Sequence, residues 1–257
     1  MKNNSCHLII NGVSYTCARI LLALLTCLLG TTAQTLYADT KNAESLLLDF
    51  NLYPYLDDVD SDNVFTLNVA AKLGNGFSYF GLLNLGNQSD RSELGDITNF
   101  YTEQSVRWQV NDSPIDLTAQ FNFRSGEDND RHRLGFRWRL NDTAMLKEVF
   151  QSINLAWSIN FHVFQFDHAD ENIWQMEHVF RLTAPQISDR LYIAGFIDHT
   201  FNEDLPGNFP DNPIVGEVQL GWRLIENLYA ITEYRVNEYR RSDVNNLAVG
   251  IEYKIKL

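Results

Sequence analysis

Cysteine is scarce in this chain of 257 residues, and its three examples, Cys6, Cys17 and Cys27, all lie near the N-terminus. They fall within a segment that we expect to be removed, so the predicted mature chain has no thiol, no disulfide and no thiolate metal site. A lipid anchor on Cys27 is disfavoured, because residues 24–26 lack a small residue just before it. No EF-hand loop spacing is present, and we predict no cofactor and no dedicated metal site.

A hydrophobic run long enough to form a membrane helix is also lacking. The best candidate, 20–30, is shorter than the roughly 20 apolar residues that such a helix needs. It follows a sparsely basic segment and precedes small residues, which is the order found in a secretory signal peptide. We expect residues 1–33 to be a signal peptide cleaved after Ala33, with Ala38 as the alternative, which leaves a single domain at 34–257.

Basic residues are few, and the chain carries 20 Lys and Arg against 33 Asp and Glu. Loss of Lys2 and Arg19 with the leader leaves 18 basic residues against the same 33 acidic ones, a net charge of −15. Nucleic acid is therefore disfavoured as a partner, because its phosphates require a basic patch.

Strict alternation of apolar and polar residues is the dominant pattern that remains. Within 115–124, the residues Ile, Leu, Ala, Phe and Phe alternate with Asp, Thr, Gln, Asn and Arg, and 133–140 and 105–110 repeat the pattern. Successive side chains of a strand point to opposite faces, so each run predicts a strand with one apolar and one polar face. Such strands fit either a soluble sandwich or a membrane barrel whose apolar face meets lipid.

The connections between the runs favour the barrel. Those at 74–76, 111–114, 186–189 and 225–227 are tight, whereas alternate connections are longer and acidic. Short turns at one end and long loops at the other are typical of outer-membrane barrels, whose short turns are periplasmic. The connection 143–153 breaks this rule, and 143–152 is the one segment whose sequence is compatible with a short helix.

We therefore predict an all-β, membrane-spanning, antiparallel up-and-down β-barrel of about twelve strands, with both termini periplasmic. In its final run, apolar residues alternate up to Leu257, which resembles the C-terminal signal of outer-membrane proteins, although that signal usually ends in Phe. We expect Trp108, Phe136 and Trp138 to face lipid. The predicted strands are 44–53, 63–73, 77–86, 100–110, 115–124, 132–141, 154–167, 173–184, 190–200, 213–224, 228–239 and 245–257.

The polar faces supply the candidate pore-lining residues. Two interpretations stay open, since these charges either pair to fill a closed lumen or form the wall of a selective pore, and neither sign dominates enough to predict strong ion selectivity. The candidates are Glu103, Arg107, Arg133, Arg137, Arg139, Glu177, Arg181, Tyr192, Phe196, Asp198, Glu217, Arg223, Glu233 and Arg235.

Aromatic residues share these faces. Tyr192 and Phe196 alternate in phase with Asp198, although a bulge that turns them towards lipid is an equal alternative. Inward rings beside carboxylates suit a hydroxylated, ring-bearing solute such as a nucleoside, because rings stack and carboxylates accept hydroxyl protons.

Several short segments follow one another over most of the mature chain, namely 77–81 (FSYFG), 101–107 (YTEQSVR), 195–198 (GFID) and 221–222 (GW), followed by Glu233-Tyr234. Their sequences and order resemble those of the Tsx-like nucleoside-channel family of outer-membrane proteins. Asn84 and Asn87 stand where that family often has an aspartate. The resemblance implies a monomeric barrel of twelve strands in the outer membrane of a Gram-negative bacterium, with a narrow pore that passes nucleosides.

Other functions find less support in the sequence. No histidine has a serine two residues later, the pair used by outer-membrane phospholipases and lipid A deacylases. An omptin-like protease remains an alternative through Asp130 and His132, with an aspartate pair at 58–60 or 60–62. A structural or adhesive barrel with a closed lumen is the stronger alternative. We expect a non-enzymatic channel whose partners are outer-membrane lipid, lipopolysaccharide and a small polar solute.

Overall fold

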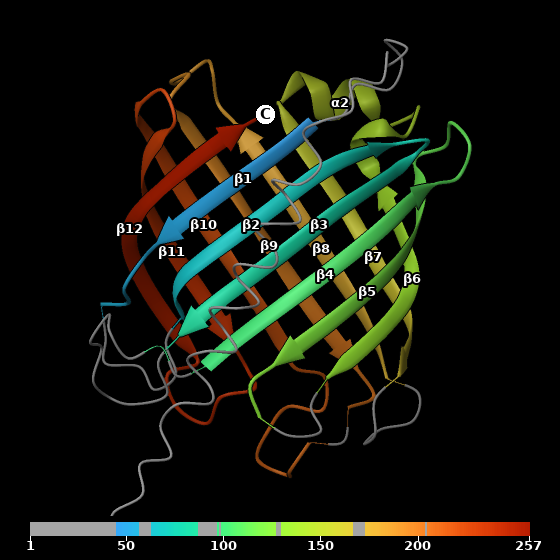
Figure 1. The fold of residues 1–257 in the computed structure, drawn as a ribbon, viewed down its shortest axis with the longest axis vertical. Helices are drawn as coiled ribbons and strands as arrows, with labels where there is room; N and C mark the ends of the chain where they lie inside the picture. The colour runs from blue at the N-terminus through green and yellow to red at the C-terminus, as the bar shows by residue number, and fades with distance from the viewer. Residues whose placement is uncertain are drawn as a thin grey trace, which may run out of the picture. The chain divides into compact units, whose positions relative to one another are not determined.

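The computed structural model describes residues 45–56, 63–86, 97, 99–126, 130–166, 173–203 and 205–257. Twelve antiparallel strands follow one another around a closed barrel (Figure 1). The strands are β1 (Ser45–Leu52), β2 (Asn63–Gly74), β3 (Phe77–Gly86), β4 (Asn99–Gln109), β5 (Ile115–Arg124), β6 (Arg131–Arg139), β7 (Leu155–Phe166), β8 (Trp174–Thr183), β9 (Leu191–Phe201), β10 (Ile214–Ile225), β11 (Leu228–Asn237) and β12 (Asn245–Lys256).

The first and last strands close the barrel. β1 pairs with β12 in a register that runs from Leu47 opposite Lys256 to Leu52 opposite Ile251, and every other strand pairs with its neighbours in sequence. Closure leaves no sheet edge, so the backbone donors and acceptors of the strands are satisfied within the sheet, as a lipid environment requires.

The two faces of the wall reverse the arrangement of a soluble protein. On β5 and β6, the outward-facing Leu117 and Leu134 are 51% and 46% exposed, whereas the inward-facing Asp116 and Gln120 are each 1% exposed. An exposed apolar face that continues around the wall is a surface for lipid. The alternation therefore defines a membrane-spanning barrel with a polar interior, and the predicted fold class is confirmed.

The predicted strand boundaries agree with the observed ones to within two residues at each end. The predicted short helix is also present, as α2 (Lys147–Ser152), which follows the 3-10 turn η1 (Leu140–Asp142) in the connection between β6 and β7. Among the described residues, no helix has both the length and the apolar character to cross a membrane.

Apart from the connection between β6 and β7, tight turns join the strands at the end of the barrel where β12 finishes. Between β2 and β3, Gly74, Asn75 and Gly76 have φ values of 80°, 50° and 79°. A positive φ has little energetic cost for glycine, and a smaller cost for asparagine than for most residues. The sequence Gly-Asn-Gly therefore suits a tight hairpin turn. Most of the longer connections at the opposite end, and the expected signal peptide, lie outside the described residues.

Candidate solute pathway in the barrel lumen

The interior of the barrel contains a cavity of about 770 Å³ whose wall is formed by inward-facing side chains of all twelve strands. Ten of the fourteen residues predicted from the sequence line it. They are Glu103, Arg107, Arg133, Arg137, Glu177, Arg181, Phe196, Asp198, Glu217 and Arg235. A volume of this size lies within the range typical of sites for small molecules.

Three arginine side chains line the cavity on β4 and β6, beside Glu103 of β4. Arg137 is held in an ion pair, with its Nη2 2.6 Å from Asp116 Oδ2. Arg133 instead donates to amide oxygens, from Nη1 to Gln120 Oε1 at 2.9 Å and from Nε to a second glutamine at 2.7 Å. Arg107 lies over the ring of Phe80, 5.7 Å from its centroid. Within the described residues, Arg107 and Arg133 make no salt bridge to a carboxylate, so their charge is directed into the lumen.

Carboxylates line the cavity on β8, β9 and β10, beside Arg181 of β8 and Arg235 of β11. Glu177 Oε2 accepts a hydrogen bond from Asn160 Nδ2 and lies 3.7 Å from His162 Nε2. Asp198 Oδ1 has no hydrogen-bond partner among the residues that the structure describes. Glu177 and Glu103 repel Asp198, while Arg133 attracts it. Charges of both signs therefore line the lumen.

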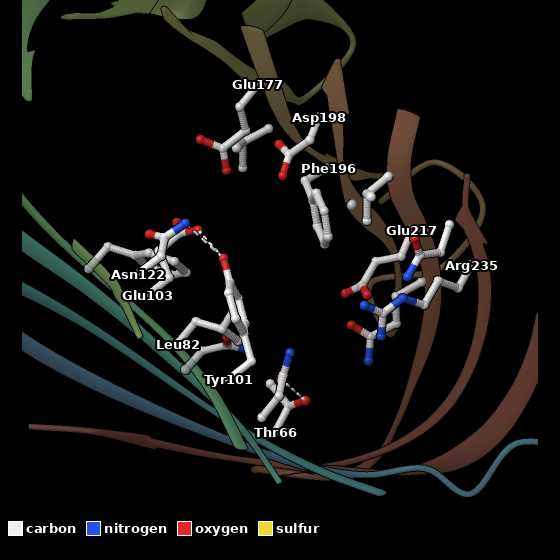
Figure 2. A pocket seen from close by; sticks show the side chains of 18 of the residues that line it. Thr66, Leu82, Tyr101, Glu103, Asn122, Glu177, Phe196, Asp198, Glu217 and Arg235 are labelled. Carbon is white, nitrogen blue, oxygen red and sulfur yellow. Dashed lines mark hydrogen bonds between the residues drawn. The ribbon is translucent and has the colours of Figure 1, made fainter. Parts of the chain in front are cut away.

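Two aromatic rings also line the cavity. Figure 2 shows Tyr101, from β4, and Phe196, from β9, on opposite sides of the cavity. The Tyr101 hydroxyl donates to Glu103 Oε2 at 3.2 Å and accepts from Asn122 Nδ2 at 3.0 Å, which fixes the ring. Phe196 lies on the same face of β9 as Asp198. An apolar ring and a carboxylate are thus adjacent on each side of the space.

Tyr192 points into the barrel and is not turned towards lipid by a bulge. Its side chain nevertheless does not line the cavity. Its ring is 2% exposed, and Arg181 Cζ and Lys254 Nζ lie 4.0 and 4.4 Å from the ring centroid. Its hydroxyl donates to Glu252 Oε2 at 2.6 Å. The ring covers Gly221, where an added Cβ would lie 2.1 Å from Tyr192 Cε1. Tyr192 therefore packs the barrel wall and does not face a solute.

Three further predicted residues lie on inward faces but outside the cavity wall. Arg139 is paired with Asp116 and with Asp142 near the short-turn end. Arg223 is paired with Asp189 of a turn at 2.6 Å, and Glu233 is 2% exposed and accepts from the Tyr55 hydroxyl at 3.4 Å. The two arginines are thus paired with carboxylates, as the pairing interpretation predicted, whereas Glu233 is hydrogen-bonded to a tyrosine.

Several lumen residues were missed by the sequence analysis. Asn122, Asn160 and Gln175 are at most 4% exposed, line the cavity, and each has a side-chain oxygen without a partner among the described residues. Tyr101 was recognised only within a motif of the family resemblance. All four occupy inward positions of predicted strands, so the alternation that selected the charges would have found them had amides and this tyrosine been included.

The mouth of the lumen at the long-loop end is bordered by Tyr239, which lies beyond the end of β11. Its hydroxyl donates to Glu203 Oε2, and Arg131 Nη2 lies 2.7 Å from the other oxygen of Glu203. Burial and the hydrogen bond to Glu203 raise the pKa of Tyr239 to about 12. This tyrosine therefore remains a neutral hydrogen-bonding group at physiological pH.

The residues of the protease alternative do not converge. His132 points away from the lumen and packs between Phe121 and Phe123, with ring centroids 5.6 and 5.8 Å away. Both proposed aspartate pairs lie outside the described residues. The observed position of His132 offers this chemistry no geometric support.

Comparisons with known proteins add only a general likeness. No family model matches the chain, and no curated protein matches it. Among solved structures, a KdgM porin is 13% identical, with 81% of this chain and 98% of that chain covered and a TM-score of 0.46. The translocator domain of the autotransporter NalP from Neisseria meningitidis is 12% identical, with coverage of 93% and 96% and a TM-score of 0.38. A mutant of the Rh. blastica porin is 10% identical, with coverage of 83% and 99% and the same score.

Resemblance at this level does not inform the function of the chain. Its class is defined by its own geometry, namely a closed barrel of twelve strands, an exposed apolar outer face and a polar interior. These are the features of an outer-membrane β-barrel.

Proposed function

We propose that this protein is an outer-membrane channel in a Gram-negative bacterium that allows passive, selective diffusion of small polar solutes, and that nucleosides are among them. The observation that carries the proposal is the position of Tyr101 and Phe196 on opposite sides of the 770 Å³ cavity, beside the carboxylates of Glu103 and Asp198. The resemblance of the sequence to the Tsx-like family supports the same solute class.

The physical requirements of a nucleoside match these groups. Its base presents a planar ring that stacks on an aromatic side chain, and its ribose presents hydroxyl donors for carboxylates. Asp198 Oδ1 is an acceptor that lacks a partner among the described residues, and Glu103 already receives one hydrogen bond from Tyr101. Transport requires release as well as entry, so we expect millimolar affinity, about 4 kcal/mol.

The charges that line the cavity act on a permeating ion through its net charge and on a neutral nucleoside through its dipole. Arg107 and Arg133 face Glu177 and Asp198, so the potential varies across the lumen while the summed charge near the cavity is mixed. Strong selectivity for one sign of ion is therefore not expected. A neutral solute with a dipole aligns with such a field without a large desolvation cost.

A structural or adhesive barrel with a closed lumen is the second candidate. The observation in its favour is the number of fixed ion pairs inside the barrel, including Arg137 with Asp116 and Lys254 with Glu252. In that case, the cavity would hold water and would not connect the two ends. Solute flux distinguishes the two candidates directly.

Liposome swelling with purified barrel tests the proposal. We expect adenosine and uridine to enter faster than a disaccharide of larger bulk. Equal rates for all three would indicate a general porin, and no swelling would indicate a closed barrel. Phe164→Ala provides a matched control for substitutions of Phe196, because Phe164 is 62% exposed on the outer face.

A further inference from the structure

The connection between β6 and β7 is held against the outside of the barrel. The outward-facing Trp138 donates from Nε1 to Thr143 Oγ1 at 2.8 Å. Asn141 Oδ1 accepts from the backbone N–H of Trp157 at 3.1 Å. The ring of Phe150, on α2, meets the outward-facing ring of Trp157 edge-on, with centroids 6.3 Å apart. The segment therefore lies beside the apolar face of the wall and not across the lumen.

An apolar stripe on this segment is left uncovered. Met145, Val149 and Ile153 are 91%, 59% and 50% exposed and are spaced four residues apart. In and next to a helix, residues at this spacing lie on one side, and each is rotated by only about 40° from the last. Leu146 and Phe150, at the edge of the same stripe, are half-buried.

The opposite side of the segment is polar. Lys147, Glu148, Gln151 and Ser152 occupy it, and each of them is exposed. The segment is thus amphipathic, although it contains only six helical residues. A helix of this length is marginal in water and needs packing against another surface to persist.

The position of the segment identifies that surface. In Figure 1, α2 lies at the end of the barrel where β12 finishes, which is the short-turn end. Trp138 and Trp157 belong to the lipid-facing side of the wall, and tryptophan is enriched where such a wall meets the headgroups. The uncovered stripe therefore continues the membrane-facing surface of the barrel at the level of the interface.

We propose that residues 143–153 form an interfacial anchor that lies in the periplasmic leaflet, with Met145, Val149 and Ile153 inserted at the boundary between headgroups and acyl chains. Its partner is the phospholipid surface. Short amphipathic helices bind in this way when their apolar side is buried just below the headgroups. The anchor fixes the depth of the β6–β7 side of the barrel, and it does so whichever solute the lumen passes.

Site-specific fluorescence on the full chain tests this inference. The three leader cysteines are replaced by serine, and an environment-sensitive probe is attached to Val149→Cys, with Glu148→Cys as the matched control on the polar side. Met145→Cys serves as a second reporter, since Met145 is the most exposed of the stripe. Each variant is folded into phosphatidylcholine bilayers, and its heat-modifiable mobility shows that the barrel has formed.

We expect the probes at 149 and 145 to shift to shorter wavelength, to be quenched by spin-labelled lipid, and to resist aqueous iodide several-fold better than the probe at 148. Equal quenching of all three probes by iodide in these bilayers would overturn the inference. That outcome would leave the stripe facing water, as expected if it docks a periplasmic protein instead.

Discussion

Asp116 on β5 bridges two arginines of the neighbouring strand, since its Oδ2 lies 2.6 Å from Arg137 Nη2 and its Oδ1 accepts from Arg139. Asp116 is 1% exposed, so the carboxylate is sealed beneath the two guanidinium groups. Arg137 lines the cavity, whereas Arg139 does not. Removing Arg137 therefore changes the charge seen by a permeating ion while leaving Asp116 one partner.

The first prediction concerns this charge. We expect Arg137→Gln to shift ion selectivity towards cations, because it removes a cation from the wall and increases the field of the facing carboxylates. Reversal potentials in a salt gradient measure the effect. Arg223→Gln is the matched control, because Arg223 is paired with Asp189 outside the cavity. Identical reversal potentials for the two variants would contradict a role of Arg137 in the pathway.

The second prediction concerns the outer face. Phe136 points to lipid and stacks on Phe161 with ring centroids 4.9 Å apart. We expect Phe136→Arg to hinder insertion, since a cation on the lipid face costs about 2–4 kcal/mol near the midplane. The assembled fraction, measured by heat-modifiable mobility, should fall. Ile187→Arg, in a turn where the residue is 80% exposed, should assemble normally. Unimpaired assembly of both variants would argue against the orientation of β6.

The architecture could be predicted from sequence because strand alternation is local. Leu117 and Asp116 differ by one position, and that difference alone assigns them to opposite faces. Barrel closure was predictable from the same pattern, because twelve such strands without an apolar core have no other way to satisfy their backbone in lipid. The helix at 147–152 was expected only because it falls in a connection that is too long for the short-turn end of the barrel.

The candidate site was less predictable, since alternation assigns a face but not a depth or a neighbour. Tyr192 points inward, yet Arg181 and Lys254, from strands distant in sequence, enclose its ring. Arg223 points inward too, but its position near the end of β10 brings it to a turn carboxylate. Which inward residues reach open space depends on the register around the whole barrel, and no single strand contains that information.

The third prediction concerns solute binding. If a base stacks on Phe196, then Phe196→Ala should weaken nucleoside block of ion current by about 1 kcal/mol, roughly fivefold, because one ring contact is lost. The conductance without nucleoside should change much less. Single-channel recording at increasing nucleoside concentration measures both quantities, with Phe164→Ala as the control on the outer face. A larger effect on bare conductance than on block would exclude Phe196 as a binding group.

The fourth prediction concerns the fit between Tyr192 and Gly221. An added methyl at 221 would lie 2.1 Å from Tyr192 Cε1, so Gly221→Ala must displace the ring from its contacts with Arg181 and Lys254. We expect a loss of about 1–3 kcal/mol in the free energy of unfolding, the usual cost of overpacking. Urea titration of the barrel in bilayers measures this loss, and Gly207→Ala, which would contact nothing within 4 Å, is the matched control.

A double-mutant cycle separates this clash from other effects of the substitution. Tyr192→Ala removes the ring, so Gly221→Ala should cost little further stability in that background. The loss caused by Tyr192→Ala itself reports the packing of the ring and its hydrogen bond to Glu252. Additive losses from the two substitutions would mean that the residues do not touch, and that the ring adopts another position in the membrane-embedded barrel.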